Sequence, residues 1–228
     1  MESLGPYLDC LGLPGPRRIV NDFFGLGRVP RGETVSLRAH MRRVRGPRLL
    51  HVNMIRIGFD TLAAPRRGAA EREIDLVVHR TRQIYDQIQL GIARVQHWVI
   101  PPAQAGGFAD IGSDGEADDL ADRFSVPNDG VDGFMVLTYA GSRIGSARPS
   151  GCDKDGKDSA VVVEIEQGDD ELTATAFAHE LGHFLGVSGH SSDPENLMFS
   201  GPNGRRINSS QAATMLTHCF VTECSGLP

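Results

Sequence analysis

Residues 176–200 read AFAHELGHFLGVSGHSSDPENLMFS, and this stretch carries most of the information about the fold and chemistry of the chain. Asp169 and Asp170 come shortly before it and suit the first turn of a helix, because the helix dipole favours negative charge there. The residues that follow predict a helix over 172–186. Gly186 is expected to end that helix, since glycine tolerates the positive φ that a C-terminal turn needs.

Within this predicted helix, residues 179–183 read HELGH, an H-E-x-x-H (HExxH) pattern. Side chains four residues apart share one helix face, so the imidazoles of His179 and His183 can converge on one ion. Zinc with three protein ligands and one water lowers the pKa of that water to about 7. Glu180 is placed to accept its proton without being a ligand. The pattern also occurs on ordinary helices, so the flanking residues decide its meaning.

The residues after the helix favour a metal site. Residues 187–189 lead to a third imidazole at His190, and Met198 follows eight residues later. At this point the chain resembles the metzincin clan of zinc peptidases, whose pattern is H-E-x-x-H-x-x-G-x-x-H followed by a methionine-containing turn, the Met-turn. The segment HELGHFLGVSGHSSDPENLM looks most like the matrixin branch, where Ser-Ser and a Pro before Leu-Met also occur.

One position departs from the clan pattern. The third ligand is expected three residues after Gly186, where this chain has Gly189, and the histidine comes one residue later at His190. Because glycine permits a backbone bulge, His190 is still the expected third ligand. Asp193 is the alternative, since carboxylate oxygen also binds zinc. The resemblance places Met198 beneath the metal, although a plain core methionine would be buried as well.

The rest of the chain predicts strands and helices around this segment. The expected strands, one of them a short edge strand at 143–147, are residues 49–59, 93–100, 133–139, 143–147 and 159–165. Further helices are expected at 70–90, after a turn at 65–68, and at 209–218. The acidic, Gly-rich stretch 103–132 is expected to lie outside the core, with one short helix at 117–124.

This order of elements predicts an α/β (α+β) fold. A strand–helix–strand opening favours a mixed, mostly parallel twisted sheet. The metzincin resemblance adds a backing helix, an active-site helix and a small irregular C-terminal subdomain with a final helix. It also implies that the edge strand lines the cleft and pairs with an extended substrate. Residues 199–206 are expected to form the specificity pocket.

The same resemblance gives the domain organisation. Residues 1–48, rich in Gly, Pro and Arg, are expected to be an irregular N-terminal extension and a candidate pro-segment. Residues 49–228 are the expected zinc metallopeptidase catalytic domain, with an upper half at 49–186 and a lower half at 187–228. Cys10 has a faint likeness to the cysteine that caps the zinc in latent matrixins, but its flanking residues match poorly.

The net charge of −6 hides an asymmetry. Residues 1–100 hold sixteen Arg and nine acids, a balance of +7, whereas 101–228 hold five Arg, two Lys and twenty acids, a balance of −13. The densest basic run, 38–48, has no interleaved aromatic residue for base stacking, so nucleic-acid binding is not expected. No membrane span is expected either, because no stretch approaches the roughly 18 apolar residues that a span needs.

The sequence leaves three questions open: the pairing of the cysteines, the compartment of the protein and the role of one acidic loop. Four cysteines allow three full pairings, between which the sequence does not choose, and Cys219 and Cys224 are close enough for a local link. No secretory leader is visible at the N-terminus, although the resemblance implies a secreted, extracellular protein. Residues 153–158 cluster carboxylates around a glycine, which makes a structural Ca²⁺ site an alternative to a solvated turn.

The sequence therefore predicts a zinc-dependent metalloendopeptidase, a hydrolase acting on proteins or peptides and expected to be a monomer. The expected ligands of one Zn²⁺ ion are His179, His183 and His190. Glu180 is the expected general base for a metal-activated water, and Gly186 and Met198 are the expected structural residues near the site. Two alternatives stay open: a non-catalytic zinc-containing binding module, which would not need the base, and a zinc hydrolase of small amide or peptide substrates.

Overall fold

The computed structural model describes residues 47–141, 143–152, 154, 159–165, 169–201 and 204–223. The helices are η1 (Phe59–Thr61), α3 (Ala64–Tyr85), η2 (Asp86–Ile88), α4 (Pro102–Ala105), α5 (Asp114–Phe124), α6 (Asp170–Phe184) and α7 (Ser209–Leu216). The strands are β1 (Arg48–Ile57), β2 (Leu90–Ile100), β3 (Asp110–Ile111), β4 (Val131–Val136), β5 (Thr138–Tyr139), β6 (Gly145–Ala147), β7 (Ala160–Glu164) and β8 (Thr222–Glu223). Nearly all of the expected extension 1–48 lies outside the described residues.

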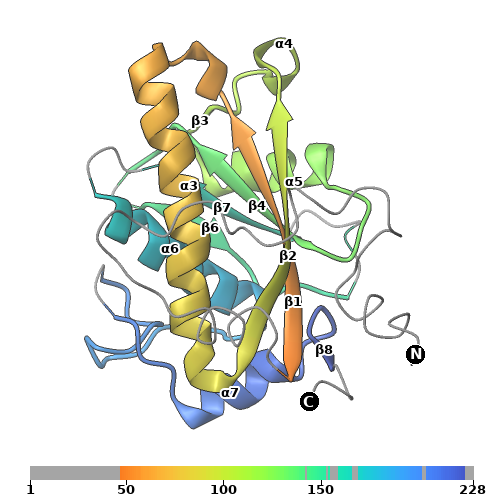
Figure 1. Ribbon diagram of the computed structural model, residues 1–228, viewed down its shortest axis with the longest axis vertical. Coiled ribbons are helices and arrows are strands. Elements are labelled where there is room, and N and C mark those ends of the chain that lie inside the picture. Colours follow the sequence, from red (N-terminus) through yellow and green to blue (C-terminus); the bar gives the residue numbers. More distant parts are fainter. Residues whose placement is uncertain are drawn as a thin grey trace, which may run out of the picture.

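A mixed, mostly parallel sheet organises the molecule (Figure 1). Its strand order is β2-β1-β4-β7-β6, and β8 pairs with the start of β1. The β1–β2, β1–β4 and β4–β7 pairs are parallel, whereas β6 runs antiparallel to β7 at the edge. The predicted α/β fold class is therefore confirmed, with α3 as the backing helix and α6 as the helix that carries the HELGH residues.

Helices α3 and α6 pack together on one face of the sheet, where the larger core cluster lies. Residues from β1, β4 and β7 point into this cluster beside Phe177 and Leu181 of α6. Tyr85 at the end of α3 donates a hydrogen bond of 3.0 Å from its hydroxyl to the carbonyl oxygen of Ala178. Because both helices rest on the same sheet face, the position of α6 is fixed by packing as well as by its own hydrogen bonds.

The prediction that residues 103–132 lie outside the core was wrong. Helix α5 buries Ala117, Leu120 and Ala121 against the opposite face of the sheet, and Ile111 of β3 joins the same second core cluster. These positions have helical spacing, but exposed carboxylates between them give the stretch a solvated appearance in the sequence. The sheet is thus covered on both faces.

The remaining elements were predicted with shifted ends. Residues 65–68, expected to be a turn, lie inside α3, because a proline in the first helical turn loses no hydrogen bond that the helix would make. The stretch 133–139 is divided between β4 and β5, and the edge strand β6 falls within the expected 143–147. Elements α4, β3 and β8 were not predicted; each is four residues or shorter.

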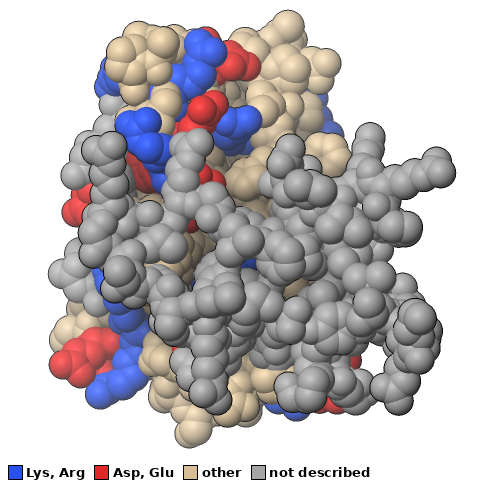
Figure 2. All heavy atoms as spheres, viewed as in Figure 1, with Lys and Arg blue, Asp and Glu red and all other residues tan. Residues whose placement is uncertain are grey.

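The surface over α3 carries charges of both signs (Figure 2). Two of its arginines form ion pairs, Arg67 with Asp60 and Arg80 with Glu171. In a third pair, Glu71 of α3 binds Arg56 of β1. The excess of arginine in the first hundred residues therefore does not form a single-signed patch on the part of this face that the structure describes. None of the described helices is both long enough and apolar enough to cross a membrane.

The disulfide joins two segments that are distant in the sequence. Cys152 bonds to Cys219, which ties the segment after β6 to the end of α7, rather than Cys219 to Cys224. The same segment is held by Ser150, whose N–H donates to Phe184 and whose carbonyl oxygen lies 3.2 Å from Nε2 of His218. Cys10 and Cys224 lie outside the described residues.

Within the candidate calcium loop at 153–158, Lys154 is the one residue that the structure describes. Its ammonium donates three hydrogen bonds, to the carbonyl oxygens of Val126 and Gly130 at 2.6 and 2.7 Å and to Oδ1 of Asp132 at 2.8 Å. The side chains of Lys154 and Asp132 are only 10% and 1% exposed. Burial lowers the pKa of Lys154, which its bonds to Asp132 oppose. This lysine neutralises a carboxylate at the start of β4.

Replacing Lys154 with methionine is expected to destabilise the protein by about 3 kcal/mol, because Asp132 would be left as a buried charge without its cation. Urea unfolding of the two proteins measures the difference. The matched control is Arg48→Met, which removes an arginine from an ion pair with Glu223 whose side chains are 37% and 73% exposed. It should cost about 1 kcal/mol or less. Equal losses in the two variants would contradict the structural role of Lys154.

Candidate metal centre

Helix α6 begins and ends two residues before the predicted 172–186, but its capping residue and its terminating glycine are the predicted ones. Asp169 is the N-cap, and its side chain accepts a hydrogen bond of 3.0 Å from the N–H of Leu172. At the other end, Gly186 has φ of +96° and its N–H donates to the carbonyl oxygen of His183 at 2.9 Å. A left-handed glycine directly after the last helical turn reverses the chain there. The following residues therefore return towards the helix face that carries the two histidines.

The three histidines meet at one point. Nε2 of His183 lies 3.1 Å from Nε2 of His179 and 3.3 Å from Nε2 of His190. The prediction that the extra loop residue is accommodated by glycine agrees with the backbone, since Gly189 has φ of +76° and a Cβ there would meet no atom within 4 Å. Among the described residues these three side chains form the group that could hold a metal ion.

Backbone carbonyls orient the two helical imidazoles. Nδ1 of His179 lies 2.7 Å from the carbonyl oxygen of Leu197, and Nδ1 of His183 lies 2.7 Å from that of Val187. A carbonyl oxygen only accepts, so each Nδ1 carries the proton and each Nε2 presents its lone pair to the centre of the group. This arrangement of an outer acceptor behind a ligating imidazole is the usual support of a metal site.

The spacing of the nitrogens fits a zinc ion. Nitrogens bound at about 2.0–2.1 Å around a tetrahedral ion lie about 3.3 Å apart. Two of the three separations, from His183 to His179 and to His190, are 3.1 and 3.3 Å, and all three ligand atoms lie within 4.8 Å of one another. Without a cation, lone pairs directed at one another over this distance repel. Burial lowers the pKa of His179 to about 4 and also lowers that of His183, so both rings are neutral at pH 7, as metal ligation requires.

Asp193, the alternative ligand, is engaged elsewhere. Its Oδ1 accepts a hydrogen bond from the N–H of Glu195, and its Oδ2 pairs with Arg206. These contacts hold the pKa of Asp193 below its usual range. Asp193 is not part of the three-histidine group, and it stabilises the loop between His190 and Met198 instead.

Glu180 lies beside the group at the edge of the sheet. Its carboxylate accepts a hydrogen bond from the backbone N–H of Ala147 in β6, while desolvation by the surrounding protein raises its pKa to about 8. The close approach of helix and strand depends on Gly145, where a Cβ would lie 2.7 Å from the carbonyl oxygen of Val162 and 3.2 Å from Cγ of Glu180. Strand β6 therefore holds the glutamate in place.

Met198 lies fully buried against α6. A Cβ on Gly182 would come within 2.7 Å of its sulfur, so the helix and the methionine are in direct contact next to His183. The N–H of Met198 donates to Oδ1 of Asn196 at 2.9 Å. The side-chain amides of Asn196 and Gln211 also bond each other twice, at 2.8 and 3.0 Å. The methionine loop is thus tied to α7.

Asn196 and Gln211 were not singled out in the sequence, although half of the signal is visible there. Asn208 and Gln211 form a capping box at the start of α7, a pattern that Asn-x-x-Gln before an apolar helix can indicate. The second role of Gln211, as partner of the buried Asn196, depends on the tertiary fold and leaves no local pattern.

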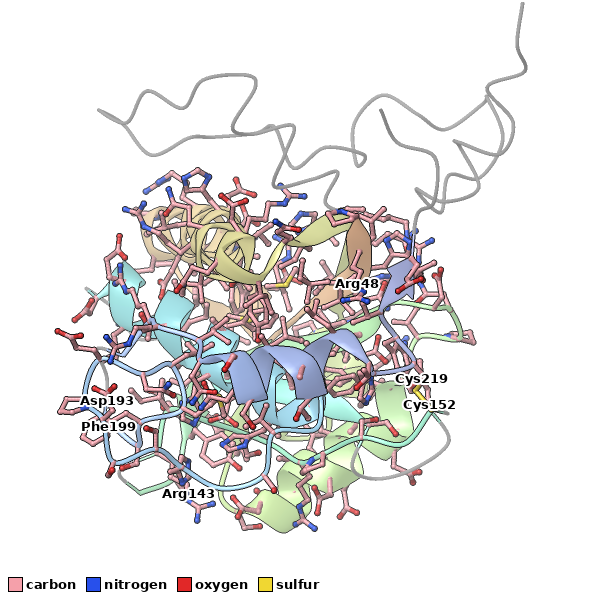
Figure 3. The ribbon with its side chains drawn as sticks, turned by 90° about the horizontal axis from the view of Figure 1, so that it is seen from below. Arg48, Arg143, Cys152, Asp193, Phe199 and Cys219 are labelled. Carbon is pink, nitrogen blue, oxygen red and sulfur yellow. A yellow bond between two sulfur atoms is a disulfide. The ribbon has the colours of Figure 1, made fainter. Side chains whose placement is uncertain are left out.

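A cavity of about 570 Å³ lies alongside the group. One wall is β6 with its flanking residues Arg143 and Arg148, and another is one face of α6 from Leu172 to His183. Phe199 and Gly201 line it on the lower side. Figure 3 shows Arg143 and Phe199 on the same side of the molecule, near Asp193. Of the expected specificity segment 199–206, residues 199–201 line the cavity, and 202–203 lie outside the described residues.

Comparison with known proteins gives a likeness of fold. No family model matches the chain, and no curated protein does. A solved structure described as a chaperone–substrate complex has a TM-score of 0.51 and 13% identity, over 75% of this chain and 34% of that one. Metalloproteinase-II from Bacteroides fragilis has a TM-score of 0.49 and 16% identity, over 75% of this chain and 52% of that one. The chain thus spans between a third and about half of these structures.

The three-histidine group could bind a metal ion. That conclusion comes from the geometry of the side chains, because the likeness to solved structures concerns the fold alone.

Proposed function

We propose that the protein is a zinc-dependent metalloendopeptidase of the metzincin type, with matrixin-like motifs and one extra residue before its third ligand. The observation that carries the proposal is the convergence of three Nε2 atoms at a cavity that Glu180 also lines. In this proposal the ligands are His179, His183 and His190. Gly186 turns the chain after the helix, and Met198 forms the floor beneath the metal.

The residues of the chain divide the chemistry between them. A bound zinc ion would supply Lewis-acid polarisation of the scissile carbonyl and would lower the pKa of water at the site. Glu180 takes a proton from the attacking water and passes it to the leaving amine. The N–H of Ala147 holds the carboxylate of Glu180, a residue that lines the cavity. Burial favours the protonated form of Glu180, and a bound zinc ion would oppose this by favouring the carboxylate, the form that accepts a proton from water.

Peptide is the substrate that the cavity favours. The outer edge of β6 pairs with no other described strand, so an extended peptide can add to the sheet there by backbone hydrogen bonds. A small amide would use neither this edge nor most of the 570 Å³ cavity. A binding module with a closed zinc site would have no use for a glutamate held beside the three imidazoles.

We also propose that the protein works as a monomer in an oxidising, extracellular compartment. The Cys152–Cys219 disulfide supports this part of the proposal, because such bonds persist mainly outside the reducing cytosol. Residues 1–48 would form an extension ahead of the catalytic domain at 49–228.

Zinc content and cleavage of a mixed peptide library test the proposal together. We expect one zinc ion per chain, cleavage at internal peptide bonds, loss of cleavage with a chelator and recovery when zinc is returned. Full zinc occupancy without cleavage, in the full chain and after removal of residues 1–48, would favour the binding module. Turnover of small amides but not of peptides would favour the small-substrate hydrolase.

A further inference from the structure

Arg143 stands two residues before β6, on the wall of the catalytic cavity, and the proposed chemistry does not use it. Its Nη1 donates to Oδ2 of Asp114, the first residue of α5, at 2.5 Å. The other carboxylate oxygen of Asp114 accepts from the hydroxyl of Tyr139 at 2.9 Å, and that hydroxyl lies 2.9 Å from Oγ of Ser146 in β6. Arg143 is therefore anchored to the strand that lines the cavity.

The guanidinium of Arg143 still has N–H groups that can donate hydrogen bonds to a ligand. Asp114 is the one hydrogen-bond partner that Arg143 has in the part of the chain that the structure describes, and its side chain is 61% exposed. A guanidinium carries five N–H donors, so most of them stay available. The hydrogen bond between the two residues lowers the pKa of Asp114 and raises that of Arg143, so both remain charged at neutral pH.

Two arginines stand at this wall in an otherwise acidic part of the chain, each paired with a carboxylate of α5. Residues 101–228 carry a balance of −13 and only five arginines. Two of these, Arg143 and Arg148, flank β6 and line the cavity, and Arg148 pairs with Asp118 at 2.9 Å. The exposed guanidinium of Arg143 would attract a substrate that carries a carboxylate.

The position of Arg143 relative to β6 indicates which residues of a bound peptide would lie opposite it. The N–H of Ala147 contacts the carboxylate of Glu180, so the proposed mechanism places the cleaved bond next to Ala147. Arg143 comes four residues earlier, which is about 13 Å along an extended strand. In an antiparallel pair, the commoner arrangement, a peptide on the edge of β6 runs the opposite way, so Arg143 faces residues downstream of the cleaved bond.

We propose that Arg143 is a specificity residue that selects peptides with an aspartate or glutamate side chain about two to four residues after the cleaved bond. This inference rests on the proposed peptidase function of the same site. The guanidinium bridges the substrate carboxylate and Asp114, which holds it in position.

Matched peptides that differ only by Glu or Gln at one downstream position test this inference. The wild-type zinc protein should cleave the Glu peptide with a kcat/KM about three- to tenfold higher, mainly through a lower KM. The ratio should fall to about one in Arg143→Gln and should shrink with added salt, because the pair is exposed. Arg123→Gln, which removes an arginine on α5 that lies over Phe124, is the control and should keep the ratio.

The variant Asp114→Asn gives a second test, because it should change the Glu-to-Gln ratio of kcat/KM only if Arg143 binds the substrate carboxylate. The amide oxygen still accepts from Arg143, but the competing negative charge is gone, so the Glu-to-Gln ratio should rise above the wild-type value. A ratio of one in the wild type, or an unchanged ratio in Arg143→Gln, would overturn the inference while cleavage itself upholds the proposed function.

If neither peptide is cleaved, the proposed function fails, and fluorescence anisotropy of the same labelled peptides still decides the role of Arg143. Tighter binding of the Glu peptide that is lost in Arg143→Gln would support the role. Equal affinity for both peptides would refute it.

Discussion

Replacing Glu180 with glutamine is expected to lower kcat for peptide cleavage by about 10²–10⁴-fold while zinc content stays at one per chain. Glutamine has the shape of glutamate, and its amide oxygen can still accept the hydrogen bond from Ala147. It cannot accept a proton at neutral pH, so the step in which water loses its proton has no base. Because Glu180 is not one of the three converging histidines, the metal should remain.

Glu171→Gln is the matched control on the same helix. That carboxylate pairs with Arg80 and Arg205 at the surface, away from the three histidines, so the variant should keep kcat within a small factor of wild type. Peptide kinetics and metal analysis of both variants give the comparison. A Glu180→Gln protein with wild-type kcat would eliminate Glu180 as the base.

Replacing His183 with alanine is expected to abolish both zinc binding and cleavage. Changing a residue behind a ligand typically costs about 10- to 100-fold in metal affinity, so removal of a ligand should exceed about 100-fold. The change also leaves the carbonyl oxygen of Val187 without its imidazole donor. We expect the thermal stability of the variant to be insensitive to added zinc, whereas the wild type should be stabilised.

His97→Ala serves as the comparison, because this histidine is exposed on β2. It should keep the zinc content, the zinc-dependent rise in thermal stability and the activity of the wild type. Full zinc occupancy in His183→Ala would show that the three-histidine group is not the metal site.

The parts of the site that are local in sequence could be predicted from it. His179, Glu180 and His183 lie within five residues of one helix, and helical geometry alone brings the two imidazoles together. The turn at Gly186 follows from the steric freedom of glycine. His190 was a less determined prediction, because a loop with one extra residue has several possible paths. Its position depends on how the loop packs against α6.

Contacts between distant segments could not be predicted in this way. Arg143, Asp114 and Tyr139 form one network, yet 25 residues separate Asp114 from Tyr139. The pairing of Cys152 with Cys219 over 67 residues likewise depends on where α7 docks. The core role of α5 was missed because carboxylates on its solvent face outnumber the apolar positions that it buries. Local sequence patterns predict single helices and strands, whereas these contacts depend on how the helices and strands pack together.

The disulfide has a consequence for metal exchange. All three histidines, Glu180 and Met198 lie between Cys152 and Cys219, so one covalent ring encloses the whole candidate centre. Closing a ring of this size removes roughly 4 kcal/mol of chain entropy from the unfolded state. If the centre holds zinc as proposed, an oxidised chain that has lost the ion would still carry the three imidazoles on one closed ring and could bind zinc again. Reduction of the bond would remove this stabilisation, so the reduced protein should unfold more readily than the oxidised one when zinc is chelated.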